Sequence, residues 1–150
     1  MTRVVAIKPA GQWQAQNFDQ VVLDADERHC RRVVLTGTGG RKFLLDLPQA
    51  TVLRDGDGLV LDDGNIVRVV GRPEALIEIA AATAHDLARL AWHLGNRHTE
   101  VQVLGERLRI RRDHVLEAML AKLGAKLTAI EAPFEPEHGA YEHGNGHHHE

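Results

Sequence analysis

Short runs of aliphatic and β-branched residues, separated by turn sequences, dominate the first half of the chain. Runs of this kind, interrupted by glycine and aspartate, are typical of strands joined by tight turns. Six strands are predicted in this half, at Arg3–Ile7, Gln20–Leu23, Arg32–Leu35, Lys42–Leu47, Leu59–Leu61 and Ile66–Val70. The pattern predicts a small all-β domain, a barrel or sandwich, over residues 1–72.

The pattern changes after the segment Gly71-Arg-Pro73, which has the composition of a linker. Period-two runs now alternate with two stretches of helical periodicity. The predicted elements are a strand at Ala75–Ala81, a helix up to Leu94, strands at Glu100–Leu104 and Arg107–Arg111, a helix after Asp113, and a strand at Lys126–Ile130. This βαββαβ order is the ferredoxin-like arrangement, so we expect an α+β chain with a ferredoxin-like domain over residues 75–135.

Capping residues set the expected helix boundaries. Thr83, with Asp86 three residues later, resembles a capping box, and Asp113 is a favoured N-cap. Glycine is common just after a helix ends, so Gly95 and Gly124 are the expected stops.

Residues 136–150 differ from everything before them. The last thirteen residues contain five of the ten histidines, at His138, His143, His147, His148 and His149. Such a segment offers almost no apolar surface, so we expect it to be a flexible tail. Dense imidazole favours nickel, copper or zinc binding. A purification tag is the alternative, although the spaced histidines are unlike an unbroken tag.

Bulk composition narrows the class of protein. A chain of 150 residues suits one or two small domains, and no apolar run approaches the ~20 residues that a membrane helix needs. The start lacks a signal-peptide core and there is one cysteine, so we expect a cytoplasmic protein that binds no membrane. Residues 131–150 carry five acidic and no basic side chains, and this negative charge favours the binding of cations. The remaining 18 basic and 16 acidic residues leave a nearly neutral body, which argues against nucleic acid.

No residue set predicts catalysis, so we expect no enzyme activity. The sequence 36–42 resembles a phosphate loop but lies between two strands and lacks a following helix, so a hairpin turn is favoured. His29 and Cys30 are strand neighbours that point to opposite faces. Arg107, Arg109 and Arg111 alternate along one strand. They indicate either a solvated sheet face or a docking surface for an acidic partner.

Two single histidines remain as candidate metal ligands. His98 follows the expected helix stop in the polar loop Gly95-Asn-Arg-His98, where functional residues are common. A lone histidine is a weak ligand, but a two-fold dimer would bring a second copy to the axis. A structural histidine is the alternative. His114 is the first residue of the second helix and could supplement a nearby site.

Three ordered motifs resemble the urease accessory metallochaperones called UreE. They are His93-Leu-Gly-Asn-Arg-His98, Arg112-Asp-His-Val-Leu-Glu-Ala-Met119 and Pro133-Phe-Glu-Pro-Glu-His-Gly-Ala-Tyr141, followed by the histidine-rich tail. The resemblance implies a peptide-binding first half and a second half that forms a homodimer. It also implies that His98 shares one nickel ion between protomers. Some members bind metal peripherally through two histidines that flank the aspartate of the second motif, but here Arg112 takes the first position and only His114 remains.

The leading hypothesis is therefore a nickel-binding metallochaperone that delivers Ni(II) for urease assembly, with a urease accessory GTPase and apo-urease as partners. The expected ligands are His98, His114, His143, His147, His148 and His149. Zn(II) or Cu(II) could also bind in vitro, since Cu(II) exceeds Ni(II) at most nitrogen sites. The alternatives are a metal store or zinc buffer without a dedicated client and, less favoured, an RNA-binding assembly factor.

Overall fold

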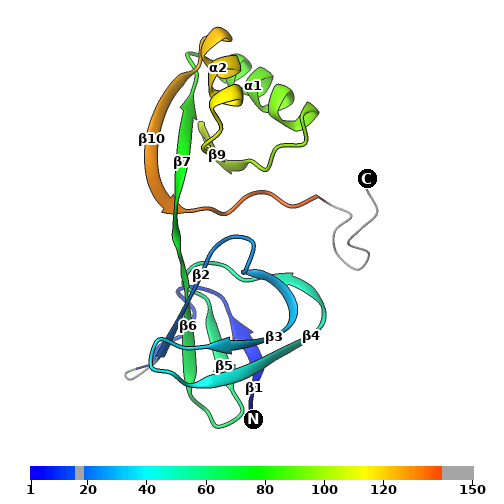
Figure 1. The fold of residues 1–150 in the computed structure, drawn as a ribbon, viewed down its shortest axis with the longest axis vertical. Helices are drawn as coiled ribbons and strands as arrows, with labels where there is room; N and C mark the ends of the chain where they lie inside the picture. Colours follow the sequence, from blue (N-terminus) through cyan, green and yellow to red (C-terminus); the bar gives the residue numbers. More distant parts are fainter. Residues whose placement is uncertain (16–18, 140–150) are drawn as a thin grey trace. The chain divides into compact units, whose positions relative to one another are not determined.

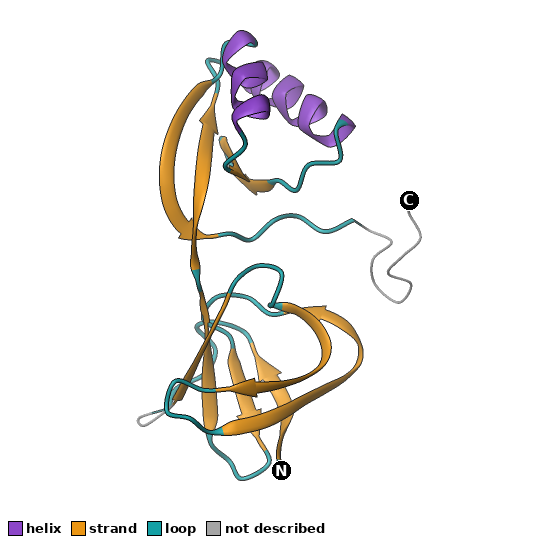
Figure 2. Cartoon of the chain, viewed as in Figure 1, coloured by secondary structure: helices purple, strands orange, loops and turns teal. Residues whose placement is uncertain are grey.

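The computed structural model describes residues 1–15 and 19–139. The described chain forms two compact units, one over Met1–Arg72 and one over Pro73–His138. Figure 1 traces the chain through both units, and Figure 2 shows that the helices of the described residues lie in the second. None of these helices is long and apolar enough to cross a membrane.

The first unit is a six-stranded sheet, which confirms the predicted all-β half. Its strands are β1 (Thr2–Lys8), β2 (Asp19–Leu23), β3 (His29–Thr36), β4 (Lys42–Val52), β5 (Gly58–Leu61) and β6 (Ile66–Gly71). They are ordered β2-β6-β5-β1-β4-β3, with β1–β4 and β2–β6 parallel and the other pairs antiparallel. The core is aliphatic apart from one fully buried phenylalanine, Phe43.

Strand β4 is longer than the sequence predicts, because it continues through Pro48. Proline cannot donate to a strand ladder and is tolerated at irregularities. The pairing of β3 with β4 shifts at this point, from Cys30 opposite Thr51 to Arg32 opposite Asp46. Pro48 lies within the shifted stretch, so the strand passes the proline where the regular ladder is interrupted.

The glycine-rich sequence after β3 is a hairpin turn, as predicted. The carboxylate of Asp19 accepts hydrogen bonds from the Gly39 backbone N–H (3.0 Å) and the Thr38 hydroxyl (3.0 Å). A Cβ at Gly37 would lie 2.1 Å from Asp19 Oδ2, so a larger residue there would displace the Asp19 carboxylate from these bonds. Desolvation alone would raise the pKa of Asp19, but the bonds from the N–H groups of Gln20 and Gly39 lower it overall. These donor groups of the turn are therefore already bonded to a carboxylate of the chain itself.

The second unit has the ferredoxin-like order that the sequence predicts. Its elements are β7 (Pro73–Ala80), α1 (Ala84–Asn96), β8 (Gln102–Leu104), β9 (Arg107–Arg111), α2 (His114–Lys122) and β10 (Lys126–Pro133). The four strands are ordered β10-β7-β9-β8, and all their pairings are antiparallel. Alternate residues of β7 and β9, including Ile79 and Ile110, pack with Leu90, Leu94 and Leu120 of the helices.

Both predicted N-caps are confirmed. Thr83 Oγ1 accepts a bond from the Asp86 N–H, and Asp113 Oδ1 accepts bonds from the N–H groups of Val115 and Leu116. The predicted end of α1 at Gly95 is wrong, since the helix continues to Asn96 and its C-cap is Arg97. Gly95 stays helical because His98, three residues later, makes the left-handed turn that ends the helix.

The packed part of the chain also reaches further than expected. The tail was expected to begin at residue 136, yet Pro136 is buried and the Glu137 N–H donates to the Val101 carbonyl at 2.8 Å. These contacts hold the chain against the second unit after β10 has ended.

Candidate metal site

His98 makes the left-handed turn at the end of α1. Its φ is +57°, and no other non-glycine residue of the described chain has a positive φ. The His98 N–H donates to the Gly95 carbonyl (3.0 Å), and the Thr99 N–H donates to the Leu94 carbonyl (3.1 Å). These two bonds form a Schellman motif with His98 at the position that is usually glycine.

Helix α2 ends in the same motif and provides an internal comparison. The Gly124 N–H donates to Ala121 and the Ala125 N–H to Leu120, both at 3.0 Å. The left-handed residue there is Gly124, with φ +88°. The two helices thus use the same ending, but α1 places an imidazole where α2 has no side chain. A side chain in this conformation costs about 1 kcal/mol, and such strain is concentrated at functional sites.

The helix end suits a cation. The His98 side chain is exposed, so an ion can reach it and leave it. The last carbonyl groups of a helix carry partial negative charge, which favours positive ions close to the C-terminus. The backbone therefore presents an exposed imidazole at a helix end whose carbonyl groups favour a cation.

His98 lines a shallow hollow of about 280 Å³, here called the His98 hollow. The loop after α1 and the start of α2 meet at this hollow. Its lining residues are Arg97, His98, Thr99, Glu100, Arg111, Arg112, Asp113 and Leu116. His114 is exposed beside it, as the first residue of α2, but does not line it. The structure therefore brings His98 close to the N-cap of α2 and leaves His114 at the margin.

Arg112 is held away from any ligand role by Glu117. Its Nε and Nη2 atoms each donate to a Glu117 carboxylate oxygen at 3.1 Å. The same carboxylate accepts the Asp113 backbone N–H at 2.8 Å. The bonds from Arg112 lower the pKa of Glu117, and the carboxylate in turn raises the pKa of Arg112. The guanidinium stays charged, and a charged guanidinium has no lone pair for a metal.

The described part of one chain does not complete a metal site. Within residues 1–15 and 19–139, no three His, Cys, Asp or Glu side chains are grouped so that they could hold an ion. The predicted ligands His143, His147, His148 and His149 lie outside the described residues. A metal bound by His98 would therefore need ligands from a second chain or from those residues.

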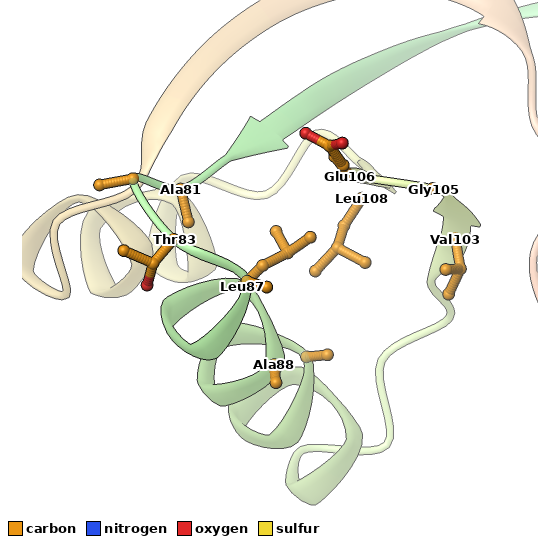
Figure 3. A pocket seen from close by; sticks show the side chains of 11 residues that line it. Ala81, Thr83, Leu87, Ala88, Val103, Gly105, Glu106 and Leu108 are labelled. Carbon is orange, nitrogen blue, oxygen red and sulfur yellow. The ribbon is translucent and has the colours of Figure 1, made fainter.

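A larger hollow in the same unit has a different character. It measures about 540 Å³ and lies between α1 and the β8–β9 hairpin, where alanines, Leu87 and Val103 line it (Figure 3). Glu106 is the one carboxylate among its lining residues, and none of them is histidine or cysteine. Cys30, in the first unit, is half-buried, and its burial raises the pKa of the thiol. Neither place offers a set of metal ligands.

Trp92 is a candidate contact residue that the sequence analysis missed. It is 64% exposed on α1, while Leu90 and Leu94 on either side of it are buried. Val115, in the first turn of α2, is 60% exposed. The helical periodicity around Leu90 and Leu94 placed Trp92 on the outer face, and this signal could have found it. An exposed tryptophan on a helix that ends at His98 is typical of a protein contact.

The arginine stripe on β9 is neutralised within the unit. Arg107 and Arg109 both pair with Glu78, at 3.0 Å each, and Arg111 pairs with Glu74 and Glu100. Of the two earlier interpretations, these pairs favour the solvated sheet face over the docking surface for an acidic partner. Strands β7 and β9 also contain no aromatic residue on which an RNA base could stack.

Comparisons with known proteins cover both units. Residues 2–72 match the model of the UreE urease accessory protein N-terminal domain, and residues 74–150 match that of its C-terminal domain. A protein named urease accessory protein UreE from Bradyrhizobium sp. (strain ORS 278) is 54% identical over 141 residues, which are 94% of this chain and 67% of that protein. Another of that name, from Beijerinckia indica subsp. indica, is 49% identical over 150 residues, covering 100% of this chain and 87% of that protein. Taken together, the two matched domains and these identities show that the chain belongs to the UreE urease accessory protein family.

Proposed function

We propose that this protein is a metallochaperone that carries Ni(II) to urease during maturation of its metal centre. The observation that carries the proposal is the exposed imidazole of His98, held in a strained helix ending in a chain of the UreE family. Nickel is the cargo, and the protein performs no catalytic step. We place this function in the cytoplasm, where the expected partners are the urease accessory GTPase and apo-urease.

The proposed carrier is a homodimer formed through residues 75–130. The exposed side chains of Trp92 and Val115 support this, since a dimer interface would bury them. Two-fold symmetry places the same patch on both chains, so one His98 would be matched by the His98 of a second copy. Such pairing would add a second imidazole to a site at which the described part of one chain does not group three ligand side chains.

Transfer would proceed by exchange of ligands. An exposed ion held by few protein ligands keeps open coordination positions, and an incoming donor can bind before the first ligand leaves. The proposed ligands from the tail are His143, His147, His148 and His149, which add imidazoles to each chain. His114 is a supplementary ligand beside the His98 hollow. Zn(II) and Cu(II) are expected to compete with nickel in vitro, as the affinity order of nitrogen sites implies.

A urease activation assay under limiting nickel tests the proposal. Apo-urease with its accessory GTPase should gain activity faster when this protein is present than when it is omitted. A His98→Ala variant should lose most of the gain, whereas the same substitution at exposed His85, in the first turn of α1, should not. Equal activation with and without the protein would favour the second candidate, a metal store or buffer without a dedicated client.

A further inference from the structure

Residues 134–138, here called the C-terminal strap, cross the sheet of the second unit. Strand β10 lies at one edge of this sheet and β8 at the other, three strand spacings or about 14 Å away. The strap begins after Pro133 in β10, and Glu137 bonds to Val101, directly before β8. Four residues span at most about 14 Å, so the strap must be almost fully extended.

Backbone bonds and burial fix the strap in this path. The Glu135 N–H donates to Gln102 Oε1 (3.1 Å), and the Glu137 N–H donates to the Val101 carbonyl (2.8 Å). Between them, Pro136 is buried, and the preceding Phe134 is fully buried. A segment with two anchoring bonds and two buried side chains is part of the folded unit.

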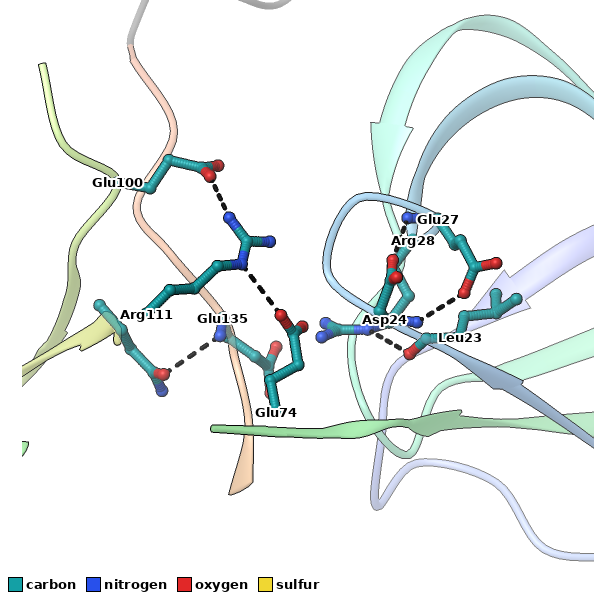
Figure 4. A network of polar contacts seen from close by, with 9 residues as sticks. Leu23, Asp24, Glu27, Arg28, Glu74, Glu100, Arg111 and Glu135 are labelled. Atoms are coloured by element: carbon teal, nitrogen blue, oxygen red, sulfur yellow. Dashed lines mark hydrogen bonds and ion pairs between the residues drawn. The ribbon is translucent and has the colours of Figure 1, made fainter. Parts of the chain in front are cut away.

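Arg111 is the centre of the contacts that hold the strap. It alternates with the buried residues Leu108 and Ile110 of β9, so its side chain lies on the face of the sheet that the helices do not cover. Its guanidinium lies over the ring of Phe134, 4.9 Å from the ring centre. Nε donates to Glu74 at 2.9 Å, and Nη1 donates to Glu100 (Figure 4).

These contacts connect the strap to the loop that carries His98. Glu100 and Val101 are two and three residues after His98. Arg111 donates to Glu100, and Glu137 of the strap donates to Val101. We call Arg111, Phe134 and Glu100 the clasp. Partial burial alone would lower the pKa of Arg111, but the bonded carboxylates raise it above its usual value, so the clasp stays charged. Three residues extend at most about 10 Å, so the end of the strap lies close to the His98 loop.

We propose that Arg111 and Phe134 are positioning residues, which clasp the strap so that the histidine-rich C-terminal residues begin beside His98. This inference rests on the proposed nickel-carrier function. His143 is five residues after His138, so its Cα is at most about 17 Å from that of His138, whatever the conformation between them. If the chain left the sheet at the β10 edge instead of crossing it, the histidine-rich residues would begin about 14 Å farther from the His98 loop. The clasp therefore raises the local concentration of imidazole at the His98 site.

The test compares Arg111→Met with Arg107→Met in the full chain by calorimetric nickel titration. Arg107 is a matched control, since it lies on the same face of the same strand but its guanidinium bonds to Glu78 of β7 rather than to the strap. Each substitution is also made in a chain whose tail histidines, His143, His147, His148 and His149, are replaced by alanine. Thermal unfolding without metal is the control that checks whether each variant folds.

We expect Arg111→Met to weaken the tightest nickel phase about tenfold when the tail histidines are present, and to have no effect when they are absent. Arg107→Met should leave nickel affinity unchanged, both in the chain that has the tail histidines and in the chain that lacks them. Equal weakening with and without the tail histidines would assign Arg111 a merely structural role and overturn the proposal, as would no weakening at all. If the unaltered protein binds no nickel, the carrier function itself is wrong.

A second variant avoids the risk that Arg111→Met fails to fold. Insertion of eight glycine and serine residues between His138 and Gly139 leaves the clasp intact and lengthens the connection from His138 to His143 from five residues to thirteen. Local concentration falls with about the −3/2 power of length, so the tail-dependent gain in nickel affinity should fall about fourfold. An unchanged gain would show that the starting point of the tail does not matter.

Discussion

His98 and Gly124 end two helices of the same unit with the same pair of hydrogen bonds. Glycine adopts the left-handed conformation without penalty, whereas a side chain with a Cβ does not. Histidine is therefore the less stable residue at this position. The proposed function needs an imidazole at the end of α1, so it predicts that His98 lowers stability and binds nickel, and both effects can be measured.

Replacement of His98 by glycine should raise stability and abolish tight nickel binding together. We expect His98→Gly to increase the free energy of unfolding by about 0.5–1 kcal/mol, because the strain is removed. His98→Ala removes the same imidazole but keeps a Cβ, so it should lose nickel without this gain. Gly124→Ala should cost about 1 kcal/mol as the reverse control. Chemical denaturation and nickel calorimetry measure both effects.

The same variants test the proposed dimer. Sedimentation should find a dimer for the unaltered protein and for His98→Ala, because the metal-free contact would come from exposed apolar side chains such as Trp92.

Tight nickel binding retained by His98→Ala would show that His98 is not a ligand. An equal stability of the alanine and glycine variants would show that the left-handed turn stores no strain.

Nickel binding should weaken strongly as the pH falls from about 7.5 to about 5.5. Imidazole must be neutral to coordinate a metal, and its reference pKa is about 6.5. Each ligand then becomes about tenfold less available, so two imidazoles predict a loss of about a hundredfold. Carboxylate ligands, which titrate near 4, would leave affinity almost flat over this range. Calorimetry in non-coordinating buffers at several pH values separates the two.

At the scale of elements, the start of α2 is fixed by charge as well as by its cap. Asp113 caps the helix, and Glu117 closes the first turn by accepting the Asp113 N–H while it pairs with Arg112. The arrangement holds the α2 side of the His98 hollow in place. Arg112 thus has a structural partner in Glu117, and its charged guanidinium is not available as a metal ligand.

Loss of the Glu117 carboxylate should destabilise α2 slightly at neutral pH. The pKa of Glu117 is lowered in the folded chain, chiefly by the bonds from Arg112, so its contribution is present above the unfolded value of about 4.3. The contribution is lost as the pH falls through the lower, folded value. Thermal unfolding should therefore show Glu117→Gln less stable at pH 7, with the difference disappearing toward pH 3. A difference that persists at pH 3 would contradict this.

At the scale of the whole molecule, the chain combines two units that each have their own apolar core. Residues 143–150 contain no apolar side chain that could add to a core. They contain four of the ten histidines. Under the proposed function, the apolar cores provide the stability and the terminal histidines provide additional metal ligands.

Deletion of residues 143–150 should lower the number of nickel ions bound and leave metal-free stability almost unchanged. The deletion removes four histidines from each chain, or eight from the proposed dimer. Transfer to urease should become slower but should not stop, because His98 remains. Equilibrium dialysis of full-length and truncated protein gives the count of ions. The same count in both would mean that the terminal histidines do not bind metal.

The sequence by itself determined the class and order of the elements. Strand runs, caps and turns depend on neighbouring residues, so the six-stranded half, the βαββαβ half and both N-caps could be predicted without tertiary contacts. His98 was also proposed as a ligand from sequence, as a polar residue in a loop and through its family motif, and this remains a prediction. The position of the helix end was not, because Gly95 signals a stop on its own and the competing left-handed turn at His98 has no local signature.

Tertiary structure alone decided which distant residues meet. Nothing in the sequence near Arg111 indicates that it joins Glu74, Glu100 and Phe134, because those partners are brought together by strand order and by the return of the strap across the sheet. The same holds for the passage of β4 through Pro48, which depends on a register shift in its neighbour. Short-range patterns fix local conformation, whereas contacts between residues far apart in sequence exist only once the sheet has formed, and the surroundings of His98 are of that second kind.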